Sequence, residues 1–110
     1  MNTATPEASG SFQLAPSANG RFVAGGPLTF ATARRAREQG LRCLASAAGG
    51  ELEVDCGGIT ASDSAGLAVL LDWLGAMQRA GRALRYTQLP TGLMTLARIS
   101  EVEELLERGV

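Results

Sequence analysis

The chain has 110 residues, which is enough for one domain with one core and too few for two. Hydrophobic residues make up 45 % and charged residues 19 %, a composition typical of a folded globular domain. The formal net charge of −1 gives no reason to expect binding to nucleic acid or adhesion to an anionic membrane. No apolar run approaches the ~20 residues needed to cross a bilayer, and the N-terminus does not resemble a secretory signal. We therefore expect a cytoplasmic protein without direct membrane insertion.

Two residue types are missing, histidine and lysine. Without histidine, Ser-His-Asp and Cys-His arrangements and most zinc sites are excluded. Without lysine, Schiff-base chemistry and a phosphate-binding P-loop are excluded as well. Cys43 and Cys56 have a spacing that suggests neither a disulfide nor a metal site, so we expect two reduced, mostly buried thiols. We predict no cofactor and no metal.

The N-terminal part is predicted to hold a disordered lead-in and a β-hairpin. Residues 1–10 are rich in Ala, Thr, Ser and Pro without apolar periodicity, which leaves residues 11–110 as the domain. Residues 11–15 and 21–24 are predicted to be antiparallel strands. Residues 16–20 form a turn cluster that ends in Asn19-Gly20, a strong hairpin signal, and Gly25-Gly26-Pro27 is predicted to close the second strand.

A first amphipathic helix is predicted to begin after residues 28–29 and to end within residues 45–50, with Thr29 or Thr32 as its cap. Gly40 should weaken its middle by about 1 kcal/mol relative to Ala. The residues at three- and four-residue steps, expected on one face, are Phe30, Ala33, Arg37, Leu41 and Leu44. The basic cluster of this helix, which we interpret as a solvated face, is Arg34, Arg35, Arg37 and Arg42.

The central stretch is LEVDCGGITASDSAGLAVLLDWL, from Leu52 to Leu74. It predicts a strand over residues 51–56, a polar turn over residues 57–64 and a helix from Ala65 to about Ala80. The stripe expected to pack on the sheet is Leu67, Leu70, Leu71, Leu74 and Met77. The residues expected off that stripe are Ala65, Ala68, Val69, Trp73 and Ala76. Trp73 is then either a partly buried helix residue or an anchor that faces a partner.

The C-terminal part predicts a strand over residues 84–89, parallel to the central strand because a helix joins them. A helix is expected from Pro90-Thr91, followed by an amphipathic piece that ends near Gly109. The predicted fold class is α/β: one domain with a small mixed β-sheet, made of an N-terminal hairpin and parallel strands, packed with amphipathic helices.

The sharpest candidate site is Asp63-Ser64-Ala65-Gly66, at the expected helix start. Asp63 or Ser64 could simply cap the helix while Gly66 eases packing. Alternatively, the Ser64 hydroxyl could meet a partner or carry a phosphate, which would be attracted by the helix N-terminus and repelled by the Asp63 carboxylate.

A family resemblance bears on this choice. The segment VDCGGITASDSAGLAVLLDWL, with the following LRYTQLP, resembles the STAS domain (sulfate transporter and anti-sigma factor antagonist) over about residues 11–106. Ser64 matches the serine that a partner kinase phosphorylates in the antagonists. The tail LPTGLMTLARISEVEELL is most similar to the MlaB type, the small STAS subunit of bacterial phospholipid-transporting ABC complexes. Ala65 stands where the antagonists usually carry a second Ser or Thr.

The resemblance implies a non-enzymatic subunit, peripheral to the inner membrane, that binds an MlaF-like ATPase subunit in a complex with a permease. It would support assembly or ATP hydrolysis and contribute to outer-membrane lipid asymmetry. Its expected partner-binding or regulatory residues are Thr60, Ser62, Asp63, Ser64, Ala65, Gly66, Val69 and Trp73. The exposed helix face from Ala65 to Trp73 would form the contact, and the isolated protein could dimerise through it.

Two other interpretations stay open. One is an anti-sigma factor antagonist, with an anti-sigma factor and a serine kinase as partners, switched by phosphorylation of Ser64. The other is an enzyme or nucleotide-binding protein that gathers Asp55, Asp63 and Ser64 near one loop.

Overall fold

The computed structural model describes residues 10–110, so nearly all of the segment expected to be a disordered lead-in lies outside the described residues. The elements in chain order are β1 (Gln13–Ala18), β2 (Arg21–Leu28), α2 (Ala33–Ser46), β3 (Glu51–Ser62), α3 (Ser64–Arg79), β4 (Ala83–Thr87), α4 (Thr91–Ile99) and α5 (Glu103–Arg108). The four strands form one sheet in the order β1-β2-β3-β4. β1 is antiparallel to β2, and β2, β3 and β4 are parallel. The predicted α/β fold with a mixed sheet is confirmed.

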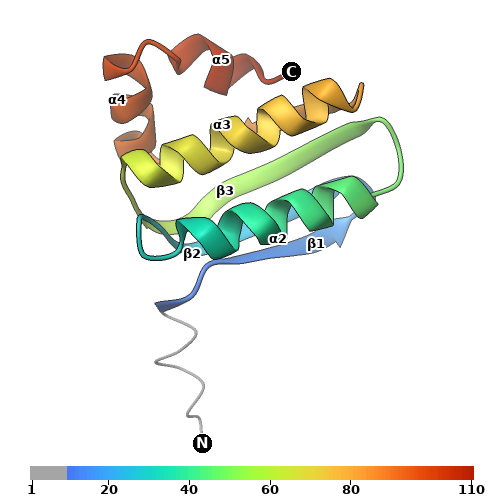
Figure 1. Cartoon of the computed structure of the whole chain (residues 1–110), viewed down its shortest axis with the longest axis horizontal. Coiled ribbons are helices and arrows are strands. Elements are labelled where there is room, and N and C mark those ends of the chain that lie inside the picture. Colours follow the sequence, from blue (N-terminus) through green and yellow to red (C-terminus); the bar gives the residue numbers. More distant parts are fainter. Residues whose placement is uncertain (1–9) are drawn as a thin grey trace, which may run out of the picture.

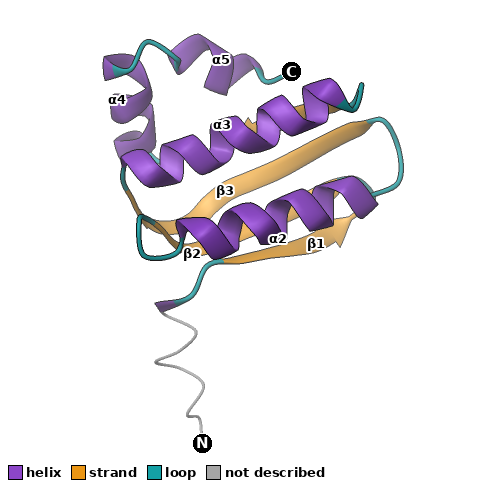
Figure 2. Ribbon diagram, in the orientation of Figure 1, coloured by secondary structure: helices purple, strands orange, loops and turns teal. Residues whose placement is uncertain are grey.

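Helices α2 and α3 lie side by side over one face of the sheet, and α4 and α5 follow beyond α3 (Figures 1 and 2). The core lies between this helical layer and the sheet. Its largest fully buried side chains are Trp73, Leu28, Leu44, Leu70, Leu74, Leu84, Leu93 and Leu106. At the far edge of the sheet, Val110 and Leu84 exchange two backbone hydrogen bonds, of 3.0 and 3.3 Å.

The hairpin turn is the one that the sequence predicts. Asn19-Gly20 joins β1 to β2, and Gly20 has φ +72°, a conformation that favours glycine. The predicted strand ends, however, are wrong. Pro16 lies inside β1 instead of in the turn, at a register irregularity between Pro16 and Ala18. Because β1 is an edge strand, a proline that donates no hydrogen bond is tolerated there.

The polar turn predicted over residues 57–64 is also wrong, because β3 continues to Ser62. The second half of β3 pairs with β2, which also continues beyond its predicted end; Gly26 lies opposite Ile59, and Leu28 lies opposite Ser62. Gly57-Gly58 and Gly25-Gly26-Pro27 predict that the strands end, because glycine and proline usually interrupt strands. Here the two segments supply backbone partners to each other, which no local pattern reveals.

Helix α2 begins at Ala33, later than predicted, and buries Ala36, Gly40 and Leu44. Phe30 therefore precedes the helix, and its side chain is 85 % exposed instead of facing the core. Arg37 is also exposed, and its guanidinium pairs with Asp72 of α3 at 3.0 Å. Thr32 is the N-cap residue, but its side chain caps no helical N–H; its hydroxyl instead accepts from the Thr29 N–H.

Helix α3 buries residues on two sides, so the predicted exposed face from Ala65 to Trp73 is wrong. Val69 is buried and Trp73 is 0 % exposed. The Trp73 indole lies against Gly40 of α2 and donates to the Arg37 carbonyl at 3.3 Å. A second helix over the same sheet face covers this side of α3. Near the C-terminus, α4 and α5 follow the prediction, and α5 ends before Gly109.

Candidate functional site

Three connections meet at one end of the sheet, where the parallel strands finish. Residues 29–32 follow β2, α3 follows β3, and α4 follows the short connection after β4. Figure 1 shows the turn before α2 beside the start of α3, with the start of α4 next to it. Because the carboxyl ends of parallel strands share one edge, side chains at these connections are presented together on a rigid support. Most of the residues singled out in the sequence lie at this edge.

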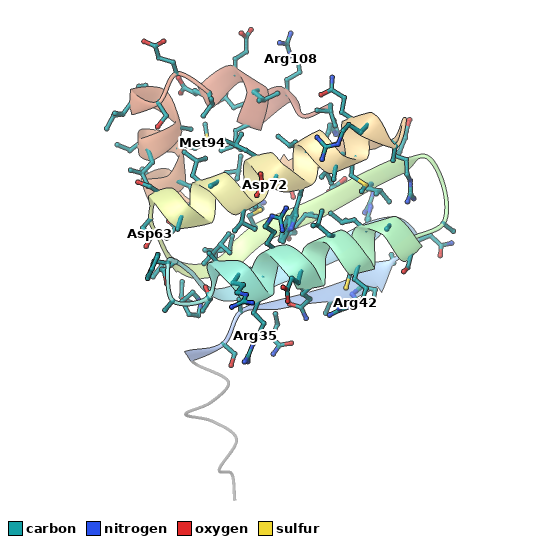
Figure 3. The ribbon with its side chains drawn as sticks, viewed as in Figure 1. Arg35, Arg42, Asp63, Asp72, Met94 and Arg108 are labelled. Carbon is teal, nitrogen blue, oxygen red and sulfur yellow. The ribbon has the colours of Figure 1, made fainter. Side chains whose placement is uncertain are left out.

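Asp63 ties two of these connections together. It is the N-cap of α3, where its Oδ1 accepts from the Gly66 N–H at 3.0 Å. Its Oδ2 accepts from the Phe30 N–H, in the turn before α2, at 2.9 Å. These backbone hydrogen bonds, that from Phe30 first, lower the pKa of the Asp63 carboxyl below its usual value. Asp63 is thus a carboxylate fixed at the start of the helix (Figure 3).

Ser64 is the first residue of α3 and is exposed. Because Asp63 does the capping, the Ser64 hydroxyl makes no hydrogen bond within residues 10–110. The hydroxyls of Thr60, which is exposed, and Ser62, which is half-buried, likewise have no hydrogen-bond partner in the described part of the chain. The end of β3 and the start of α3 therefore present three hydroxyls that can bond to another molecule.

The remaining predicted site residues divide into two groups. Ala65 is half-buried beside Ser64, and its small side chain leaves the start of the helix accessible. Gly66 is buried, and a Cβ built there would collide with the Leu28 carbonyl, so its role is the close approach of α3 to β2. Val69 and Trp73 belong to the core and are not brought to this edge. Their expected role at an exposed interface is therefore corrected to packing.

Phe30 is a surface residue of this edge that the sequence pattern assigned to the helix face. The Phe30 ring is exposed, while the backbone N–H of the same residue donates to Asp63. This hydrogen bond joins the turn before α2 to the start of α3. The available signal was the pair Thr29 and Thr32, typical turn and capping residues that place Phe30 before the helix.

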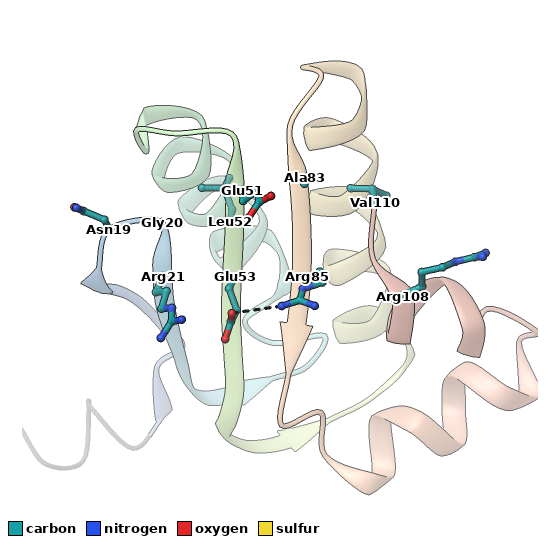
Figure 4. A pocket seen from close by; sticks show the side chains of 10 residues that line it. All are labelled: Asn19, Gly20, Arg21, Glu51, Leu52, Glu53, Ala83, Arg85, Arg108 and Val110. Atoms are coloured by element: carbon teal, nitrogen blue, oxygen red, sulfur yellow. Dashed lines mark ion pairs between the residues drawn. The ribbon is translucent and has the colours of Figure 1, made fainter.

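A hollow of about 540 Å³ lies elsewhere, over the first residues of β3 and β4 (Figure 4). Arg21, Glu53 and Arg85 stand in one row across three neighbouring strands. Arg85 and Glu53 pair at 3.9 Å, an exposed contact worth about 0–1 kcal/mol. Three arginines, Arg21, Arg85 and Arg108, line this hollow together with Glu51 and Glu53, so it is a solvated polar surface of mixed charge.

Two ionisable side chains, Asp55 and Cys56, lie in the middle of β3. Burial, together with the nearby Asp55 charge, raises the pKa of the Cys56 thiol to about 12, so Cys56 is no nucleophile at neutral pH. Asp55 accepts from the Gly57 N–H at 2.8 Å. Within residues 10–110, no group of three or more Cys, Asp or Glu side chains could hold a metal ion. Nor does any helix in that range have the length and hydropathy of a membrane span.

The fold defines the class, a small α/β domain in which two helices cover one face of a mixed four-stranded sheet. A family model described as "Mlab, STAS domain" matches residues 14–107, most of the sequence, and the chain therefore belongs to this STAS domain family. Among curated proteins, no sequence matches this chain.

Solved structures agree on the fold. The unphosphorylated anti-sigma factor antagonist SpoIIAA matches with a TM-score of 0.60 and 13 % identity, over 80 % of this chain and 82 % of that one. SLC26A9 matches with a TM-score of 0.60 and 17 % identity, over 80 % of this chain and 17 % of that one. The murine anion transporter Slc26a9 in its inward-facing state matches with a TM-score of 0.55 and 15 % identity, over 81 % of this chain and 14 % of that one. This chain thus corresponds to a small part of the transporters, and these likenesses concern the fold alone.

Proposed function

We propose that this chain is a non-enzymatic cytoplasmic subunit that binds the ATPase subunit of an Mla-type phospholipid-transporting ABC complex. The observation that carries the proposal is the exposed Ser64 hydroxyl, which has no partner within the described residues, beside a helix start that Asp63 holds rigid. The match to an MlaB-type family model supports the assignment to a transporter subunit. In this role the protein supports assembly or ATP hydrolysis of a complex that contributes to outer-membrane lipid asymmetry.

The contact surface consists of side-chain hydroxyls around the small side chain of Ala65. Thr60, Ser62 and Ser64 supply hydroxyls that can donate and accept, and Ala65 allows a partner backbone to come close. Hydrogen bonds at such a rim fix the orientation of a protein–protein contact. The sheet holds this surface in place, so binding orders few side chains and loses little conformational entropy.

A second candidate function is an anti-sigma factor antagonist that a serine kinase switches. The observation that favours it is again Ser64, whose hydroxyl is exposed to a kinase and does not cap its helix. A phosphate there would add about −2 of charge next to the Asp63 carboxylate. Repulsion from Asp63 and from acidic partner groups would oppose docking, while the helix N-terminus would favour the phosphate.

The test measures binding of the purified chain to the purified ATPase subunit of the Mla-type transporter from the same cells. Ser64→Asp is expected to weaken binding about tenfold or more, because it puts an unmatched charge into the contact. Ser64→Ala should weaken it less, since it removes only neutral hydrogen bonds. Ser100→Asp, which adds the same charge at the exposed end of α4, is the matched control. Unchanged affinity of Ser64→Asp, with an unchanged melting temperature, would remove Ser64 from the interface.

A native pull-down distinguishes the two candidate functions. Mass spectrometry would identify the partners and the state of the Ser64 peptide. An ABC ATPase and permease with unmodified Ser64 support the transporter subunit. A serine kinase with phosphorylated Ser64 would move the assignment to the antagonist.

A further inference from the structure

We infer that the docking surface continues from the start of α3 across Phe30 onto the arginine face of α2, and that it takes an acidic surface of the partner protein with an apolar socket for the Phe30 ring. This inference rests on the proposed function and names the chemistry of its partner. The arginine face is defined as Arg34, Arg35 and Arg42, the exposed arginines of α2 that line a groove beside residues 10–13. Figure 3 shows Arg35 and Arg42 on the side of α2 that is turned away from α3.

Phe30 is held out by an ordered turn. Its own N–H donates to Asp63, and the neighbouring Thr29 N–H donates to the Thr32 hydroxyl at 3.0 Å. That hydroxyl donates in turn to the Pro27 carbonyl at 2.9 Å. The turn is therefore fixed by side chains of two connections, while the ring remains 85 % exposed. Because the backbone that carries the ring is already ordered, binding has to order only the side-chain torsions of Phe30, which suits an interface anchor.

The three side chains of the arginine face form no ion pair within residues 10–110. Arg37 pairs with Asp72, but within residues 10–110 no ion pair or hydrogen bond engages the side chain of Arg34, Arg35 or Arg42. Glu38 is the acidic residue of this face, so the four side chains together carry a formal charge of +2. The chain as a whole has a net charge of −1, so the positive charge is a local feature. Such a patch attracts an acidic surface and speeds association.

The arginine face also borders a groove of about 770 Å³. Ala31 and Thr32 line the groove at one end, next to Phe30, and Arg42 lies further along α2. Gly10 to Gln13 form its other wall. The anchor and the positive charge thus follow one continuous path that begins at the Asp63 contact, which favours a single partner over two independent ones.

The test uses the same purified ATPase subunit and two variants outside the α3 start. Phe30→Ala should weaken binding about tenfold or more, as an anchor residue does, with an unchanged melting temperature because the ring is exposed. Arg34→Ala with Arg35→Ala should slow association and make the affinity less dependent on salt. Glu38→Gln should act in the opposite direction and speed association. The matched control is Arg79→Ala with Arg108→Ala, which removes the same charge at exposed positions on α3 and α5.

The outcomes separate this inference from the proposed function. If Ser64→Asp weakens binding while Phe30→Ala and the double arginine variant bind like the unaltered chain, the extended surface is refuted and the transporter-subunit role stands. If the unaltered chain does not bind the ATPase subunit, both proposals fall. If the double arginine variant loses binding only to vesicles that contain phosphatidylglycerol, α2 faces lipid and the acidic protein partner is refuted. If Phe30→Ala only converts a dimer into a monomer, Phe30 belongs to a self-contact instead.

Discussion

At the scale of single residues, Asp63 caps α3 and Ser64 does not, a distinction that the sequence does not make. Both residue types cap helices well, so spacing alone cannot assign the cap. The structure gives the cap to Asp63, whose two oxygens hold Gly66 and Phe30. Ser64 is then available for contact with another molecule. The start of α3 is therefore held in place by Asp63, while the Ser64 hydroxyl remains able to form a hydrogen bond with another molecule.

Asp63 makes stability depend on pH in a predictable direction. Its pKa is lowered in the folded state, so its hydrogen bonds stabilise the fold above the unfolded-state pKa of about 3.9. That contribution is lost as the pH falls below this value toward the folded-state pKa. We expect the unaltered chain to be more stable than Asp63→Asn at neutral pH, and the difference to shrink on acidification below about pH 4. Urea unfolding at several pH values measures it.

Glu107→Gln, which removes a charge at an exposed position of α5, is the control for this series. It should leave the pH dependence nearly unchanged, because exposed charges contribute little. A constant stability difference between the unaltered chain and Asp63→Asn across the acid range would show that the Asp63 contacts do not depend on its ionisation.

At the scale of elements, the pairing of α2 with α3 decides which side of α3 is exposed. Trp73 fills the space that Gly40 leaves, and it also meets Phe12 of the segment before β1, with ring centroids 6.1 Å apart. Arg82, beyond the end of α3, donates to the carbonyls of Leu44 and Ala47 at the end of α2, at 2.8 and 2.5 Å. The two helices are therefore joined at the middle and at one end.

Gly40 provides the test of this contact. In an isolated helix, Gly40→Ala would stabilise by about 1 kcal/mol. Here the new methyl group collides with the Trp73 ring, so we expect the opposite sign, a loss of about 1–3 kcal/mol in the free energy of unfolding. In a double-mutant cycle, Trp73→Phe should recover part of the loss, because a smaller ring makes room. Additive effects of the two substitutions would contradict the contact.

At the scale of the whole molecule, one core connects all four strands to the helices, so buried groups should become accessible only when the domain opens. Cys56 is 0 % exposed in the middle of β3, whereas Cys43 on α2 is half-buried. Thiol reagents react with the thiolate, and burial raises the pKa of Cys56 to about 12. The two cysteines therefore report on different parts of the structure.

We expect a thiol reagent at pH 8 to modify Cys43 first. In a Cys43→Ser variant, Cys56 should react about a thousandfold or more slowly than in the unfolded chain, since opening is rare in a stable domain. Added urea should speed this reaction as it lowers the free energy of unfolding. Mass spectrometry of timed samples measures the rates, and Cys56→Ala provides the reference for Cys43. Rapid labelling of Cys56 without denaturant would contradict its burial in a cooperative core.

Much of the fold follows from the sequence. The Asn19-Gly20 turn is a local backbone preference, and the alternation of Leu52, Val54 and Cys56 and the stripe of α3 are hydrophobic periodicities that can be found within one segment. The sequence also predicts a candidate site at the start of α3, although the polar turn expected there is reduced to Asp63 between β3 and α3. The family resemblance was readable in the same stretch and is confirmed by the match over residues 14–107.

The tertiary structure decided what depends on partners distant in the chain. β2 and β3 extend through glycines and a proline because each supplies the other with hydrogen bonds. Trp73 and Val69 are buried because α2 packs beside α3, a contact that the periodicity of one helix cannot show. Phe30 is exposed because Asp63, more than thirty residues later, holds its backbone. The sequence alone therefore predicts a candidate site at the start of α3, and only the packing of the helices on the sheet determines which of its side chains face outward.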